Sequence, residues 1–235
     1  MNVGGLPSGR RRIRAGLAVA FALVLGTVIA TGPSTPEPQA DTVGATKAVF
    51  DEFDGESGAA PGGMWTARSG TGFGAGTETY QAGNVFLDGE GHLVVQATRE
   101  SSGTYTSGLA WTKYNGVFGY GTISARMKMP GGQGLNPTFW LLGADSDAVG
   151  WPASGEIDIV ELPSTSTRLY STLHGPIEGT DATQYVQLIS THPDLSTDYH
   201  TYWVRRLENQ ITFGIDKQTV ATLTPDSLGP GQAWV

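Results

Sequence analysis

Turn-forming residues punctuate this chain so densely that short strands suit it better than long helices. The 235 residues include 34 Gly and 13 Pro, and only 15% of the residues are charged. Glycine and proline interrupt helices and mark turns, so the regular segments between them have to be short. The sequence also contains no heptad pattern or internal repeat. We therefore expect an all-β fold, and the length fits one sandwich domain.

Several segments show the patterns of strands. Residues 122–129 and 93–97 alternate between two faces, as expected for strands with one dry and one wet side. In residues 139–142 an apolar run between a proline and a glycine predicts a buried central strand. Residues 50–55 alternate apolar and acidic side chains before a turn and are expected to form the first edge strand of the domain.

The first forty residues have the pattern of an export segment. Four arginines between positions 10 and 14 precede an apolar run from Ala15 to Ala30, and a Pro-rich spacer then reaches Ala40. We expect residues 1–40 to be a cleaved signal peptide and spacer, and residues 41–235 to be a secreted domain. An uncleaved membrane anchor stays open, because the run is near the lower length limit for crossing a bilayer. The arginines leave both the general and the twin-arginine export routes open.

Cysteine content and charge narrow the possible partners. The chain has no cysteine, so it has neither a disulfide framework nor a lipid-modified cysteine. Its formal net charge is −8, and removal of residues 1–40 would make it about −11. Such a surface repels nucleic acids and polyanionic polysaccharides. We expect a monomer that binds a neutral polysaccharide, with no nucleic-acid partner and no stable membrane association after cleavage.

Three carboxylates cluster in the segment EIDIVE. In a strand, Glu156 and Asp158 would share one face while Ile157 and Ile159 are buried on the other. Glu161 has the wrong parity for the acidic face, but a β-bulge in front of it would absorb the extra residue and return it to that face. Mutual repulsion among three carboxylates raises the pKa of at least one of them.

The chemistry that uses such a pair is glycoside hydrolysis with retention of configuration. One carboxylate attacks the anomeric carbon and the other protonates the leaving oxygen, which requires carboxyl groups about 5–5.5 Å apart. Asp158, between the two glutamates, is placed to hydrogen-bond the nucleophile. A solvated acidic strand face and a calcium site remain as alternatives. Trp140 and Trp151 are close in sequence, and sugar rings stack on such side chains.

Several further segments resemble characteristic segments of a known family, in the same order along the chain. They are residues 50–55, 78–85, 105–108, 120–126, 151–156, 172–175 and 200–202. Together with EIDIVE they make most of residues 50–223 resemble glycoside hydrolase family 16, in particular its laminarinase-like members, which are endo-β-1,3-glucanases. The resemblance implies a jelly-roll (concanavalin-like) β-sandwich with an open substrate groove. It also implies Glu156 as the nucleophile, Asp158 as its electrostatic helper and Glu161 as the general acid/base.

The resemblance further implies a set of residues that contact the substrate. These are Asn84, Arg126, Trp140, Trp151 and His174, with the two tryptophans as stacking platforms. Each has an alternative: a tryptophan can belong to the core, His174 can be a satisfied polar residue, and Arg126 can be a solvated strand residue. The family needs no cofactor. Some relatives hold a structural Ca²⁺ near the first strand, where Glu52 is a candidate ligand, but we assign no metal.

The chain also departs from the family pattern. Asn136-Pro137 stands where Trp-Pro is usual, which removes one potential sugar platform. Arg205 and Arg206 stand where an acidic residue and a tryptophan are frequent. Family members continue beyond the position of Val235 into strands that complete the sandwich, so we expect the domain to be incomplete at its C-terminus. A partial sequence and a natural truncation both stay open.

The expected function is retaining endo-hydrolysis of β-1,3-glucan or mixed-linked β-1,3-1,4-glucan by double displacement. A galactan or agarose hydrolase on the same scaffold is an alternative, although the acidic surface disfavours sulfated galactans. A carbohydrate-binding sandwich that does not cleave is another, which the three carboxylates disfavour. An inactive truncated remnant is the third. Linkage preference, chain-length preference and the balance between hydrolysis and transglycosylation depend on loop geometry.

Overall fold

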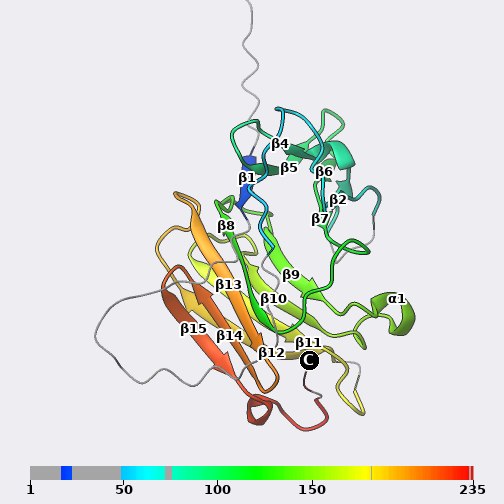
Figure 1. The fold of residues 1–235 in the computed structure, drawn as a ribbon, viewed down its shortest axis with the longest axis vertical. Coiled ribbons are helices and arrows are strands. Elements are labelled where there is room, and N and C mark those ends of the chain that lie inside the picture. Colours follow the sequence, from blue (N-terminus) through cyan, green and yellow to red (C-terminus); the bar gives the residue numbers. More distant parts are fainter. Residues whose placement is uncertain (1–16, 23–48, 72–75, 181, 233, 235) are drawn as a thin grey trace, which may run out of the picture.

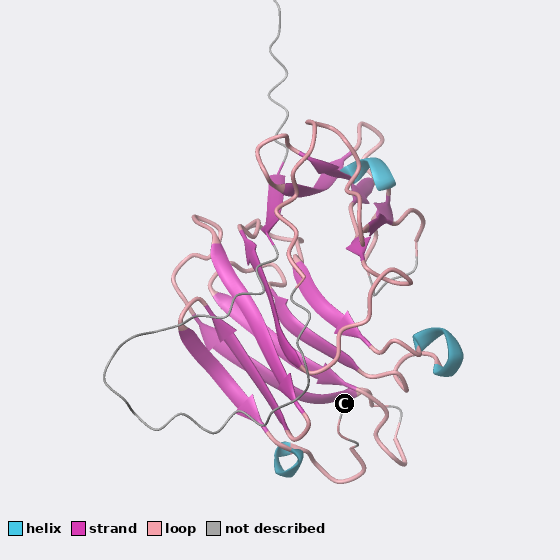
Figure 2. Ribbon diagram, in the orientation of Figure 1, coloured by secondary structure: helices cyan, strands magenta, loops and turns pink. Residues whose placement is uncertain are grey.

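The computed structural model describes residues 17–22, 49–71, 76–180, 182–232 and 234, and their regular secondary structure is almost entirely β-strand, connected by loops (Figures 1 and 2). The larger sheet has the order β15-β14-β13-β8-β1-β5-β6-β3, with β4 also paired to β5. Its strands are β1 (Leu17–Ala22), β3 (Thr79–Tyr80), β4 (Val85–Leu87), β5 (Leu93–Arg99), β6 (Tyr105–Ser107), β8 (Gly121–Met127), β13 (His200–Leu207), β14 (Gln210–Ile215) and β15 (Gln218–Leu223).

A second sheet has four antiparallel strands in the order β12-β11-β10-β9. They are β9 (Thr138–Leu142), β10 (Glu156–Glu161), β11 (Arg168–His174) and β12 (Gln184–Thr191). The remaining elements are short: β2 (Thr66–Ala67) pairs with β7 (Ala110–Trp111), and the helices are η1 (Ala82–Asn84), α1 (Ser146–Val149) and η2 (Pro225–Ser227).

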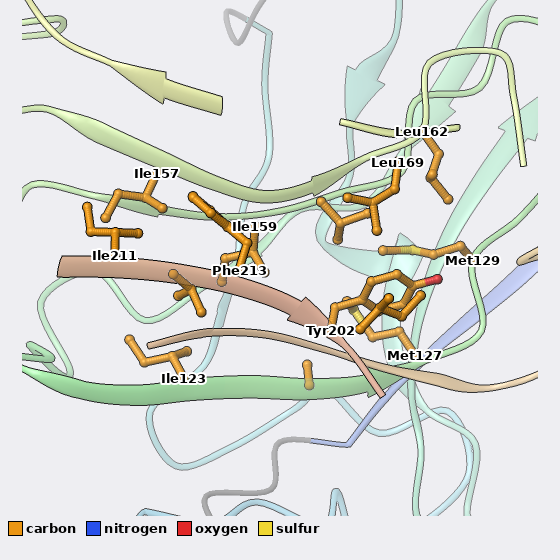
Figure 3. Packing of buried hydrophobic residues seen from close by; sticks show 14 of the residues in the cluster. Ile123, Met127, Met129, Ile157, Ile159, Leu162, Leu169, Tyr202, Ile211 and Phe213 are labelled. Atoms are coloured by element: carbon orange, nitrogen blue, oxygen red, sulfur yellow. The ribbon is translucent and has the colours of Figure 1, made fainter. Parts of the chain in front are cut away.

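The core lies between the four-stranded sheet and the β8, β13, β14 and β15 part of the larger sheet (Figure 1). Figure 3 shows Ile157 and Ile159 of β10 on one side of this core and Ile123, Ile211 and Phe213 on the other. All five side chains are buried. Burial of large aliphatic and aromatic side chains provides about 1.5–3 kcal/mol each, and it holds the two layers together. The predicted all-β class and jelly-roll sandwich are confirmed.

The predicted strands are only partly confirmed. Alternation in residues 122–129 and 93–97 corresponds to β8 and β5. The run 139–142 forms β9, but its residues are half-buried and it lies at the edge of the described four-stranded sheet, so the central position was wrong. An apolar run shows that a strand is covered, but it does not show how many neighbours the strand has.

Residues 50–55 do not form the edge strand that their alternation predicted. Only Asp51 makes an isolated bridge there. Phe53 has a φ of 55°, which is a left-handed conformation that breaks an extended strand. The Asp51 carboxylate accepts hydrogen bonds from the Phe53 backbone N–H at 2.9 Å and from the Trp65 indole N–H at 2.8 Å. These bonds compete with strand pairing, so the segment is a fixed turn.

Strand β1 lies inside the predicted export segment. It pairs antiparallel with β5 and β8, so it joins the sandwich part of the larger sheet to β5. The rest of residues 1–40 lies outside the described residues, and export and cleavage remain predictions. Removal of residues 1–40 would take β1 away and expose the hydrogen-bonding edges of β5 and β8 that it covers. None of the described helices is long and apolar enough to cross a membrane.

Replacing Tyr202 with phenylalanine is expected to stabilise the protein. Tyr202 in β13 is 0% exposed, and its hydroxyl has no hydrogen-bond partner within the described chain. A buried hydroxyl without a partner costs about 1 kcal/mol or more. We expect Tyr202→Phe to raise the free energy of unfolding in urea by about that amount. The control is Tyr80→Phe, which removes a hydroxyl that donates to Glu78 at 3.1 Å. A lower stability for Tyr202→Phe would contradict the prediction.

Candidate active site

The acidic strand β10 contains the bulge that the spacing of its carboxylates predicted. Its register with β11 shifts between Asp158 and Glu161, and its register with β9 shifts between Asp158 and Val160. Ile159 and Val160 are both buried, at 2% and 0% exposure, so two successive side chains point into the core. This returns Glu161 to the outer face that carries Glu156 and Asp158. The prediction of a bulge is confirmed.

A side chain of the neighbouring strand supports the bulge from inside. The Ser171 hydroxyl donates a hydrogen bond of 2.8 Å to the backbone carbonyl oxygen of Ile159. Ser171 is buried at 1% exposure. A bulge disturbs the regular ladder between strands, so a backbone carbonyl beside it requires another donor. Ser171 supplies that donor.

Each carboxylate has two cross-strand neighbours on the outer face of the sheet. Residues directly opposite each other in adjacent strands share a face and touch. The neighbours are Leu142 and His174 for Glu156, Trp140 and Thr172 for Asp158, and Thr138 and Tyr170 for Glu161. The structure therefore brings two predicted substrate-contacting residues, Trp140 and His174, beside the predicted catalytic residues.

Trp151 contacts the first glutamate directly. Its indole N–H donates a hydrogen bond of 2.6 Å to Oε2 of Glu156, and its ring lies 6.1 Å from that of His174 at an angle of 51°. The side chain is 52% exposed, so Trp151 is not a core residue. It belongs to the loop between β9 and β10, which also contains α1. An exposed ring beside a carboxylate can stack on a ligand while its N–H holds the carboxylate.

His174 and Asp158 form an ion pair at the centre of the site. Nε2 of His174 lies 3.0 Å from Oδ2 of Asp158, which is 5% exposed. The hydrogen bond to Asp158 and the charges of the three carboxylates raise the pKa of His174, against burial, which lowers it. Nδ1 of His174 is buried and has no partner among the described residues. When protonated, His174 places a positive charge among the carboxylates.

Burial and mutual repulsion raise the pKa values of both glutamates. Burial and then the charge of Asp158 raise the pKa of Glu156 to about 7, while the Trp151 hydrogen bond and the His174 charge oppose the shift. Burial and the charge of Asp158 also raise the pKa of Glu161, against a hydrogen bond from the Asn136 side chain. The site therefore binds a proton near neutral pH, as a pair of groups for acid and base catalysis must.

Of the other two predicted substrate-contacting residues, Arg126 lies on the opposite side of the sandwich from the carboxylates. Arg126 is on β8 of the larger sheet, and its exposed side chain points away from the core, with its guanidinium 4.4 Å from the centre of the Tyr199 ring. Because the carboxylates lie on the outer face of the opposite sheet, the core separates Arg126 from them. Asn84 ends η1, and its side-chain nitrogen is buried without a described partner.

Three residues near the carboxylates were not predicted as site residues. The Thr172 hydroxyl donates to Oε2 of Glu161 at 3.4 Å, and Tyr170 lies opposite Glu161 on β11. The Asn136 side chain lowers the pKa of Glu161 through hydrogen bonding. The alternation of β11 puts Tyr170 and Thr172 on the same face as His174, but only the strand register shows that this face is shared with the glutamates.

The described residues offer little for a metal ion. Among them, no group of three or more His, Asp or Glu side chains is arranged to hold one. Glu52, the candidate Ca²⁺ ligand, is exposed beside the turn at Phe53. Within the described chain it has no set of companion ligands, so we derive no step through a metal.

Comparisons with known proteins show the family of this chain. The family profile described as "Glycosyl hydrolases family 16" matches residues 74–233, which is more than half of the chain. The chain belongs to this family. The match covers the four-stranded sheet, every strand of the larger sheet except β1, and all three carboxylates.

Individual relatives are similar over part of their lengths. A "Glucan endo-1,3-beta-glucosidase" of Cryptopygus antarcticus is 30% identical over 142 residues, which are 57% of this chain and 52% of the relative. A "Clotting factor G alpha subunit" of Tachypleus tridentatus is 32% identical over 128 residues, 53% of this chain and 18% of the relative. The chain therefore spans about half, or less, of the length of these relatives.

A solved structure is similar over more of the chain. The laminarinase catalytic domain from Thermotoga maritima MSB8 aligns with a TM-score of 0.66 and 31% identity, covering 75% of this chain and 76% of that one. The two chains are therefore similar in sequence and in fold, and this similarity supports the jelly-roll sandwich.

Proposed function

We propose that this chain is a retaining endo-hydrolase of β-1,3-glucan or mixed-linked β-1,3-1,4-glucan. The observation that carries the proposal is the bulged strand β10, which places Glu156, Asp158 and Glu161 on one outer face. Family membership supports glycoside hydrolysis, and two of the similar proteins are named for action on β-1,3-glucan or as a laminarinase. The exposed Trp151 beside Glu156 provides a surface for a sugar ring.

The reaction follows a double displacement. A carboxylate oxygen of Glu156 attacks the anomeric carbon while Glu161 gives its proton to the glycosidic oxygen, which leaves with the reducing-side sugar. Glu161, now a carboxylate, then takes a proton from water, and that water releases the sugar from Glu156. Asp158 holds His174 at 3.0 Å, and His174, when protonated, favours ionised Glu156.

The nucleophile must lose its proton before it can attack. Because the pKa of Glu156 is raised to about 7, kcat/KM is proposed to rise with pH through about 7 on its acid side. On the alkaline side it falls when the site loses the proton that Glu161 donates. Trp151 and His174 both favour the ionised form of Glu156, so they limit the upward shift of its pKa.

The proposed setting is extracellular. The acidic composition suits a neutral polysaccharide and disfavours nucleic acid, and the export pattern of residues 1–40 supports secretion. We propose that the secreted domain acts as a monomer. The substrate-contacting residues supported by position are Trp140, Trp151 and His174.

Two other candidate functions can be judged from the same residues. A glycan-binding sandwich needs aromatic surfaces but gains nothing from three mutually repelling carboxylates, among which Glu156 and Glu161 have raised pKa values. A galactan hydrolase uses the same chemistry and differs in the sugar contacts alone. The choice of substrate therefore needs a direct comparison of polysaccharides.

The test compares laminarin, barley mixed-linked β-glucan and agarose as substrates. We expect new reducing ends from laminarin or the mixed-linked glucan, with a fast fall in viscosity, because internal cleavage shortens chains before it releases small sugars. The control is the double variant Glu156→Gln/Glu161→Gln. Binding of laminarin with no reducing ends above this control would contradict hydrolysis, and cleavage of agarose alone would contradict the substrate.

Replacing Trp151 with phenylalanine is expected to separate its two roles. Phenylalanine keeps a ring for stacking but removes the indole N–H that donates to Glu156. The pKa of Glu156 then rises further, so the acid side of the kcat/KM profile moves to higher pH. Trp151→Ala should show the same movement together with a higher KM. An unchanged profile in both variants would show that the hydrogen bond does not control Glu156.

A further inference from the structure

Asn136 lies on the same face as Glu161, just before strand β9. The pairing of β9 with β10 continues past Thr138, because the Leu162 N–H donates to the Pro137 carbonyl at 3.2 Å. Beyond it, the Ser164 N–H donates to the Leu135 carbonyl at 2.7 Å. Side chains alternate along a strand, so Asn136 shares the face of Thr138, the residue opposite Glu161. Asn136 is therefore the diagonal neighbour of Glu161.

The side chain uses this position to contact the carboxylate. Hydrogen bonding by the Asn136 side chain lowers the pKa of Glu161, which fits its place diagonal to that residue. Because this effect lowers the pKa, the amide N–H of Asn136 is the donor and the ionised carboxylate of Glu161 is the acceptor. The Thr172 hydroxyl donates to the same carboxylate from the other side, at 3.4 Å. Glu161 thus has its own donor from a loop, as Glu156 has in Trp151.

We propose that Asn136 is a positioning residue that holds the carboxyl group of Glu161 toward the leaving group. The proposal rests on the proposed function, in which Glu161 protonates the glycosidic oxygen. When Glu161 gives up that proton it becomes a carboxylate, and the Asn136 N–H donates to the charge that develops. The bond is stronger to the charged form, so it favours proton transfer to the leaving oxygen. A turn residue with no such role is the alternative reading of Asn136 before Pro137.

The test uses Asn136→Leu, which keeps the branched shape but has no donor, and the matched control Gln133→Leu. Gln133 is in the same loop, is exposed, and donates to the Ser164 hydroxyl at 3.4 Å instead of to Glu161.

Two substrates are compared: laminarin, whose leaving sugar needs a proton, and 2,4-dinitrophenyl β-laminaribioside, whose leaving group departs without one. We expect Asn136→Leu to lower kcat/KM on laminarin by about tenfold or more, with less than about a twofold change on the aryl glycoside. Gln133→Leu should match the wild type on both.

Equal losses on both substrates, or an Asn136→Leu variant that behaves like Gln133→Leu, would overturn the proposal.

A second measurement is independent of activity. In protein labelled with ¹³C at the glutamate carboxyl carbon, the Glu161 signal is assigned by its loss in Glu161→Gln. The pKa from its pH titration should be higher in Asn136→Leu than in the wild type, and an unchanged pKa would overturn the contact. A wild-type chain that cleaves neither substrate would refute the proposed function, and the titration would then decide the Asn136 contact alone.

Discussion

Glu156→Gln is expected to reduce the hydrolysis of laminarin by at least about 1,000-fold. Glutamine has nearly the shape of glutamate and still accepts the Trp151 hydrogen bond, but its amide cannot attack the anomeric carbon. Reducing ends released per minute give the result directly. A variant that keeps more than about a tenth of the wild-type rate would contradict the role of Glu156 as nucleophile.

The same variant is expected to be more stable than the wild type at alkaline pH. Because the pKa of Glu156 is raised to about 7 in the folded state, the folded protein holds a proton that the unfolded chain releases near pH 4.5. Stability is therefore lost as the pH rises from about 4.5 to about 7, by at most about 3 kcal/mol for this group. Glutamine has no such penalty. The melting temperature should rise by a few degrees at pH 8 and stay unchanged near pH 4.

Glu161→Gln is expected to lower laminarin hydrolysis by about 100- to 10,000-fold through loss of the general acid. This variant differs from Glu156→Gln in how its reaction rate depends on the leaving group of the substrate. With 2,4-dinitrophenyl β-laminaribioside, the first step needs no proton, so a rapid burst of dinitrophenolate should precede a slow steady state. The slow phase reflects the missing base for water in the second step.

Two comparisons make this result specific to Glu161. Glu156→Gln should show no burst with the same aryl glycoside, because it cannot form the covalent intermediate. Azide should accelerate the slow phase of Glu161→Gln, since an anion can attack the intermediate without a base. Equal behaviour of the two variants on the aryl glycoside would contradict the separate roles of the two glutamates.

The acidic strand β10 was predictable because its signal is local. The order of charged and apolar residues within six positions fixes which side chains share a face, and it requires a bulge before Glu161. Ile159 and Val160 are both buried, as that bulge demands. The all-β class followed in the same way from turn residues and alternation along single strands.

The surroundings of the strand were less predictable because they depend on pairing between distant segments. Thr172 and Tyr170 reach the carboxylates only through the register of β11 with β10. Arg126 shows the opposite case: its alternation within β8 was predicted, but the side of the sandwich on which β8 lies was not. At Phe53, hydrogen bonds to Asp51 override a strand pattern that is locally plausible.

At Asn136 the chain departs from the family pattern, and the structure shows what this residue lies beside. From the sequence it was only the absence of a tryptophan before Pro137. In the structure the smaller amide side chain lies diagonal to Glu161 on the same face and lowers its pKa. A platform for a sugar ring is thus replaced by a polar contact to the proposed acid, which the sequence alone could not show because the pairing of β9 beyond Thr138 was unknown.

The stereochemistry of cleavage tests the central claim most directly. Proton NMR of laminarin during the first minutes of digestion distinguishes the two anomers of each new reducing end before they interconvert. Two successive displacements at one carbon retain its configuration, so the β-anomer should accumulate first and the α-anomer should appear later by mutarotation. Initial accumulation of the α-anomer would mean a single displacement by water, and it would contradict the assignment of Glu156 and Glu161 as a retaining pair.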